Sequence, residues 1–199
     1  MLPRMDAVEE RVFVHLASGD VAAAASAAIE GYAPAVHGYL CTLLDEDDAH
    51  DARSQWAEDL WQGLPAFRRE CSLRAWSYRL AWHASCRLRR DPYRARGHRL
   101  ATSLASRLAA SAATSTIVTG SRRAGLERLR AKLPPEDQTL LTLRVDRELD
   151  WDEVAAVLSS EGEEVTAVAL RQRFARLKVR LKELARADGL LDDASPEGT

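Results

Sequence analysis

Arginine and aromatic side chains are concentrated between Arg68 and Arg99, a pattern that suits contact with nucleic acid. This stretch holds ten arginines against Glu70 and Asp91, a net charge of +8, and it also contains Trp76, Tyr78, Trp82 and Tyr93. Aromatic rings stack on unpaired bases, with roughly 1–3 kcal/mol per base, while guanidinium groups hold phosphates. The chemistry implied is binding of single-stranded nucleic acid.

A helix over Ser72 to Arg90, projected at about 100° per residue, divides these side chains between two faces. The first face is apolar and is predicted to pack in the core: Leu73, Trp76, Leu80 and Ala84. The second face is predicted to meet unpaired bases, with further arginines around the circumference: Tyr78, Trp82, Ser85 and Arg89, then Arg74, Arg79, Arg87 and Arg90. A structural alternative stays open, in which the rings cover a neighbouring helix and the arginines are solvated.

A second basic helix is predicted near the end of the chain, at about 166–187. One apolar stripe runs along it at alternating spacings of four and three: Leu170, Phe174, Leu177, Leu181 and Leu184. Basic side chains occupy the remaining surface, with Arg173, Arg176 and Arg180 opposite the stripe and Arg171, Lys178 and Lys182 beside it. A recognition helix in a DNA major groove has this arrangement, and its arginines can read guanine edges or hold phosphates. A solvated helix or a coiled-coil seam would have the same pattern.

Other helices are needed to position these two. The acidic start of a helix at 49–64 is compatible with the positive end of the helix dipole, and Pro65 ends it. Short helices are predicted at 136–144 and 151–158, the second capped by Asp150 or Asp152. With a turn at 159–164 and the last basic helix, they predict a helix-turn-helix.

Charge and composition predict two small helical domains. Residues 45–59 carry seven acidic side chains and one arginine, so the charge reverses at the basic stretch, and acidic residues again precede basic ones downstream. Residues 100–125 are rich in Ser, Ala and Thr, which favours a linker. The predicted segments are a helical N-terminal extension at 1–32, a domain at 33–95, a flexible linker at 96–125, a domain at 126–187, and a disordered tail at 188–199.

Overall composition limits the classes of function. Ten glycines and seven prolines in 199 residues favour an all-α fold, and the net charge of −2 argues against a uniformly basic nucleic-acid binder. Cys41, Cys71 and Cys86 lie far apart without a CxxC pair, which fits a reducing cytoplasm. The alanine-rich stretch at 21–29 is too short for a membrane span, so neither export nor membrane insertion is expected.

Catalytic motifs are not apparent in the sequence. The five histidines are scattered, and there is no HExxH, Gly-rich phosphate loop or GxSxG. His50 lies near Asp47 and Asp51, but a solvated acidic helix start explains this grouping better than a metal site does. We therefore expect no enzyme activity, no cofactor and no metal.

Two stretches resemble the extracytoplasmic-function sigma factors. The run from Ser72 to Arg90, SLRAWSYRLAWHASCRLRR, resembles the S-F-R-T-W-L-Y-R-I-A-R-N…L-R-R signature of their promoter-melting domain, and the residues from Asp51 to Phe67 resemble the preceding helix, which in relatives grips the clamp helices of RNA polymerase. Downstream, the residues from Leu133 to Arg144 and from Leu149 to Leu158 resemble the L-P-…-L-L-L-R-…-L-S-Y-E-E-I-A-…-L pattern of their promoter-upstream domain. Together the stretches cover over half of the chain, in the family's order.

The resemblance implies a sigma factor that brings core RNA polymerase to promoter DNA and helps to melt it, with an anti-sigma protein as a further candidate partner. Polymerase binding is then expected from Asp51, Gln55, Leu60 and Trp61. Binding of the downstream promoter element is expected from Arg74, Tyr78, Arg79, Trp82, His83, Arg87, Arg89 and Arg90. Binding of the upstream element is expected from Arg171, Arg173, Arg176 and Lys178.

Three departures from the family pattern support an alternative function. The polymerase-binding motif D-L-V-Q-E-T-F reads Asp51-Ala-Arg-Ser-Gln-Trp-Ala57 here, and His83 stands where relatives usually carry Asn. The turn before the last helix is long and acidic, with Glu161, Glu163 and Glu164. The alternative is a sigma-like or helix-turn-helix regulator that binds DNA or a partner protein but does not support initiation by itself.

Overall fold

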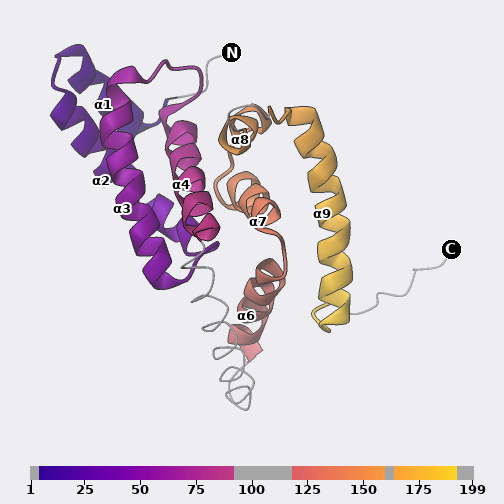
Figure 1. Ribbon diagram of the computed structural model, residues 1–199. Helices are drawn as coiled ribbons and strands as arrows, with labels where there is room; N and C mark the ends of the chain where they lie inside the picture. The colour runs from indigo at the N-terminus through magenta and orange to yellow at the C-terminus, as the bar shows by residue number, and fades with distance from the viewer. Residues whose placement is uncertain (1–4, 92–117, 160–163, 192–199) are drawn as a thin grey trace.

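The computed structural model describes residues 5–91, 118–159 and 164–191, with side chains in the second range from Gly125 onward (Figure 1). These residues form eight α-helices and no β-strand, so the all-α prediction is confirmed. None of the helices in the described ranges has the length and apolar character that a bilayer crossing requires.

Four helices make up the first half of the protein, residues 5–91. They are α1 (Ala7–Ala17), α2 (Val21–Leu40), α3 (Glu46–Gly63) and α4 (Leu73–Arg90), with a short 3-10 turn, η1 (Leu64–Ala66), after α3. Each α-helix begins after a side chain that accepts a hydrogen bond from the backbone N–H three residues later, and the four caps are Asp6, Asp20, Asp45 and Ser72. Helix α2 runs through the predicted boundary between residues 32 and 33, so the N-terminal extension is part of this helical unit.

The second half, residues 118–159 and 164–191, contains four further helices. They are α6 (Val118–Ala131), α7 (Pro135–Leu141) continued by the π-helical segment η2 (Thr142–Asp146), α8 (Trp151–Leu158) and α9 (Ala167–Ala187). Helix α8 begins with a capping box, in which the Asp150 side chain accepts from the Glu153 N–H and the Glu153 side chain accepts from the Asp150 N–H. The three predicted helices of this half are therefore present.

The predicted linker and tail coincide only in part with described residues. Residues 96–117 of the linker lie outside the described ranges, whereas 118–125 are helical as the start of α6. The first residues of the predicted tail fold back on the second half: the Leu190 N–H donates to the Ala185 carbonyl at 2.8 Å, and Lys132 Nζ binds the Asp188 carboxylate at 2.7 Å. Residues 192–199 of the tail are outside the described ranges.

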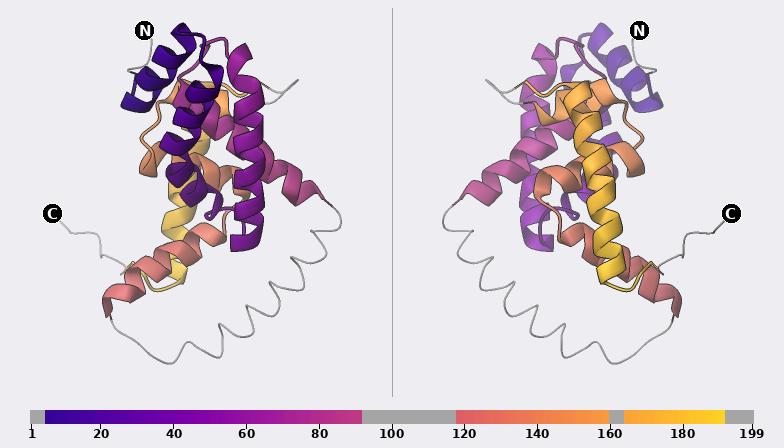
Figure 2. Two further views of the ribbon diagram at one scale, coloured as in Figure 1. Left: turned by 90° about the vertical axis from the view of Figure 1, so that its left-hand side faces the viewer. Right: turned by 90° about the vertical axis from the view of Figure 1, so that its right-hand side faces the viewer.

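The core extends across both halves as one cluster of buried apolar side chains, which includes Trp56 and Leu73 from the first half and Leu140, Leu143 and Val154 from the second. Helix α4 is central to it, because it contacts α2 and α3 on one side and α8 on the other (Figure 1). The predicted separation into two independent domains is therefore not confirmed. Helix α9 lies on the opposite side of the molecule from α1 and α3 (Figure 2).

Polar contacts between the halves accompany this packing. The Tyr39 and Thr139 hydroxyls are hydrogen-bonded at 3.1 Å. The Arg74 guanidinium donates to the Arg147 carbonyl at 2.6 Å, and the Arg147 guanidinium donates to the Ala35 carbonyl at 3.1 Å. The Ser72 hydroxyl also donates to the Glu153 carboxylate. These hydrogen bonds join the halves at several points, while the buried Arg147 Nε has no hydrogen-bond partner in the described part of the protein.

Two glycines of α2 provide a matched test of the helix packing. A Cβ added at Gly31 would lie 2.5 Å from Val8 Cγ1 of α1, whereas one at Gly38 would meet only the Arg147 guanidinium at 3.4 Å. We expect Gly31→Ala to destabilise the protein by about 1–3 kcal/mol, because the overlap displaces α1. Gly38→Ala should instead stabilise it by about 0.5–1 kcal/mol through helix propensity. Urea unfolding of both variants measures the difference, and equal effects would contradict the close α1–α2 packing.

Candidate nucleic-acid interface

The aromatic face of α4 is covered, contrary to the prediction that it meets solvent and unpaired bases. Tyr78 is 2% exposed, Trp82 is 7% exposed, and Ser85 is fully buried. The Tyr78 ring packs edge-on against Tyr39 at 5.6 Å, and burial raises the pKa of Tyr78. The cause is the packing of α2 from the first half and of α8 from the second half on α4. In this conformation, Tyr78 and Trp82 match the structural alternative of rings that cover neighbouring helices.

Several predicted DNA-binding arginines of α4 have protein partners. Arg74 bonds the Arg147 carbonyl in the interface between the halves, and Arg87 forms an ion pair with Asp59 of α3. The Arg89 guanidinium lies 5.0 Å from the Trp82 ring, and its Nη1 is buried without a hydrogen-bond partner among the described residues. Arg74 is therefore positioned to hold the two halves together, whereas Arg89 contacts Trp82, Ser85 and Cys86 of its own helix. Only Arg87 and Arg90 of the predicted arginines on α4 are exposed.

His83 and Arg79 lie half-buried on the same helix. The His83 Nε2 atom is buried and has no hydrogen-bond partner in the described part of the chain. Burial and the adjacent positive charge of Arg79 lower the pKa of His83, so its imidazole is neutral at pH 7. No described residue forms an ion pair with Arg79 or Arg90. These groups are available to a ligand.

Helix α3 presents one part of the predicted polymerase-binding set and buries another. Trp61 is 46% exposed and Asp51 is exposed, while Gln55 is half-buried. Leu60 is fully buried, so its assignment to a contact surface is wrong: it lies on the side of α3 that enters the core. An exposed tryptophan is a frequent feature of binding surfaces.

Trp56 has a role that the sequence patterns did not indicate. It is fully buried, and its indole N–H donates to the Ser77 carbonyl of α4 at 3.1 Å. This hydrogen bond attaches α3 to α4 in the middle of the core. Trp56 lies within the segment where the family pattern departs, so a structural role explains the large residue there.

The basic face of α9 is largely solvent-exposed. Arg171, Arg176 and Lys178 are exposed, whereas Arg173 is half-buried and its Nε donates to the Asp137 carboxylate at 2.6 Å. Arg180, which sequence reasoning placed on this face without assigning it a contact, is exposed as well. The four exposed cations lie on both flanks of the buried side of α9, Arg171 and Lys178 on one flank and Arg176 and Arg180 on the other. Together they form the basic strip, the strongly positive exposed surface of this helix.

The opposite side of α9 fixes its orientation on the second half. Leu170 and Leu177 are buried, and the Phe174 ring packs edge-on against Trp151 of α8 at 5.5 Å. The Arg171 guanidinium lies 5.9 Å from the same Trp151 ring. Helix α8 contacts both α4 and α9, so α9 is held with its basic side outward. A helix presented in this manner has the dimensions to enter a DNA major groove, about 12 Å wide.

Residues 160–163, which join α8 to α9, lie outside the described ranges, and they include Glu161 and Glu163 of the predicted acidic turn. Glu164 is exposed at the start of the next described range. Within the described ranges, no group of three His, Cys, Asp or Glu side chains is arranged to hold a metal ion. Comparison with models of known protein families and with curated proteins found no match to this chain.

Proposed function

We propose that this chain is a sigma factor that directs core RNA polymerase to promoter DNA, with α9 as the helix that reads the upstream duplex. The observation that carries the proposal is the exposed basic strip of α9, formed by Arg171, Arg176, Lys178 and Arg180 and presented by α8. Phosphate contacts from such a strip give affinity, and bidentate arginine contacts to guanine give specificity. In the sequence, α9 follows the basic helix α4. The extracytoplasmic-function family, which the sequence resembles, has its promoter-melting domain and its promoter-upstream domain in the same order.

Polymerase binding is assigned to the exposed side of α3, around Trp61 and Asp51. Trp61→Ala is expected to weaken binding of core polymerase more than about tenfold, because exposed tryptophans are frequent hot spots with effects of about 2 kcal/mol or more. Fluorescence anisotropy of the labelled chain with core polymerase measures this affinity. Val14→Ala, at another exposed apolar residue on α1, is the control that should bind normally. Unchanged affinity of Trp61→Ala would contradict this assignment.

Promoter melting by Tyr78 and Trp82 requires α4 to separate from the second half, since both rings are buried where the halves meet. We therefore assign the conformation described above to a closed state of the factor, which opens on polymerase and DNA. An anti-sigma partner and a cytoplasmic location are parts of the same proposal and follow from the resemblance.

A second candidate function is favoured by this same burial. A helix-turn-helix regulator would use α9 on duplex DNA and would leave Tyr78 and Trp82 permanently in the core. Co-purification with core polymerase, followed by runoff transcription on a library of promoters, separates the two. A stable stoichiometric complex that starts transcription supports the sigma factor, and duplex binding without either supports the regulator.

A further inference from the structure

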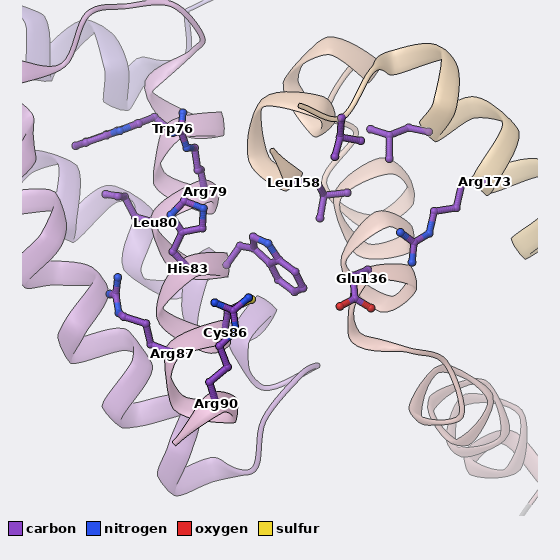
Figure 3. Close-up of a pocket in the computed structure, with 13 residues that line it drawn as sticks. Trp76, Arg79, Leu80, His83, Cys86, Arg87, Arg90, Glu136, Leu158 and Arg173 are labelled. Atoms are coloured by element: carbon purple, nitrogen blue, oxygen red, sulfur yellow. The ribbon is translucent and has the colours of Figure 1, made fainter. Parts of the chain in front are cut away.

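A cavity of about 790 Å³ lies between α4 and the second half of the protein. One wall is α4, which carries Arg79, His83 and Arg90, and the facing wall carries Glu136, Leu158 and Arg173 (Figure 3). Sites for small molecules typically have volumes of about 300–1,000 Å³ and combine apolar walls with a few polar groups. The size of the cavity therefore suits a small-molecule ligand.

The charge of the cavity favours an anion. Arg79 and Arg90 have no ion pair with any described residue, and Arg87 and Arg173 add two more guanidinium groups that already pair with Asp59 and Asp137. Guanidinium groups match the geometry of phosphate oxygens and bind them through paired hydrogen bonds. The excess of arginines along one helix suits a ligand with several phosphate oxygens.

The lining residues other than the arginines indicate which groups the ligand carries besides phosphate. Trp82, Leu158 and Leu170 supply flat or apolar surface next to the arginines. The buried Nε2 of His83 has no hydrogen-bond partner among the described residues, and such atoms normally bind a polar group. Glu136, the acidic side chain of the lining, can accept hydrogen bonds from hydroxyl groups such as those of a ribose.

From these features we infer that the cavity binds a nucleoside polyphosphate, with its phosphates at Arg79 and Arg90 and its base among the apolar side chains and His83. Both halves line the cavity, so the ligand binds the closed conformation and stabilises it. The inference needs neither polymerase nor DNA, and its test is therefore independent of the proposed function.

Isothermal titration of the full-length chain with nucleoside diphosphates and triphosphates tests this inference, with pyrophosphate and free nucleosides as separate arms. We expect saturable binding of a nucleotide that is tighter than binding of either fragment, and a higher melting temperature in its presence. Absence of saturable binding by any nucleotide would overturn the inference. Pyrophosphate binding as tightly as the nucleotide would also overturn it, because the base would then contribute nothing.

Substitutions of lining residues test whether the ligand binds in this cavity. Arg79→Ala with Arg90→Ala should weaken nucleotide binding by about tenfold or more, because two charge-assisted contacts are lost. Arg68→Ala with Arg128→Ala removes the same charge from exposed positions outside the cavity lining and should leave binding unchanged. Leu158→Trp fills the cavity without changing its charge and should also abolish binding, with folding checked by circular dichroism. Equal loss in both arginine pairs would refute the assignment to this cavity.

Discussion

Replacing Arg171 and Arg176 together with alanine should lower the affinity for promoter duplex by roughly 30-fold or more. Both side chains are exposed on the basic strip of α9, and the opposite side of that helix is anchored on Leu170 and Leu177. Each arginine that reads a guanine contributes about 1–3 kcal/mol of discrimination, so the pair accounts for the predicted factor. Fluorescence anisotropy on duplexes selected from a random library by the unmodified protein measures the loss.

The control variant removes two positive charges from the first half of the protein instead of from α9. Arg11→Ala with Arg68→Ala changes two exposed arginines of the first half and should weaken binding little. Binding to core polymerase should be normal in both double variants, because neither pair lies on α3. If the two pairs weaken duplex binding equally, the protein holds DNA through general charge, and α9 is not a recognition helix.

Arg147→Ala should open the protein and raise its affinity for single-stranded DNA by roughly 10-fold to 100-fold. The Arg147 guanidinium donates to the Ala35 carbonyl, and the backbone carbonyl of the same residue accepts from Arg74, so this position connects the halves in both directions. Hydrogen bonds of charged groups contribute about 1.5–3 kcal/mol, and losing that free energy shifts the closed state toward the open one by a similar factor. Opening exposes Tyr78 and Trp82 to bases.

A neighbouring arginine provides the matched control. Arg144 lies in η2, three residues before Arg147, but its guanidinium donates to the Leu149 carbonyl within the second half. Arg144→Ala should therefore leave single-strand binding and the radius of gyration from small-angle scattering unchanged, while Arg147→Ala increases both. A compact Arg147→Ala variant with ordinary single-strand binding would disprove the closed-state proposal and would favour the duplex-binding regulator.

Local features of the sequence were sufficient to predict most of the helices. Ser72 caps α4, Asp150 caps α8, and the leucine stripe of α9 has the period of one buried face. Such signals depend on residues three or four positions apart, so one sequence contains all the information that they need. The exposure of Arg171, Arg176 and Arg180 on α9 followed from the same periodicity, whereas the pairing of the half-buried Arg173 with Asp137 did not.

Only the tertiary structure decided what covers α4 and which side chains of α3 are exposed. Periodicity gives the angle of a side chain around its helix, but it does not say which neighbour lies at that angle. Helix α4 is central and has α3 on one side and α8 on another, so Tyr78 and Trp82 are buried by segments distant in the chain, among them α2 with Tyr39 and α8. Leu60 and Trp61 are adjacent in sequence, yet one enters the core and the other faces solvent. The order and spacing of residues therefore determined the helices and their chemistry, while contacts between distant segments determined which of that chemistry is accessible.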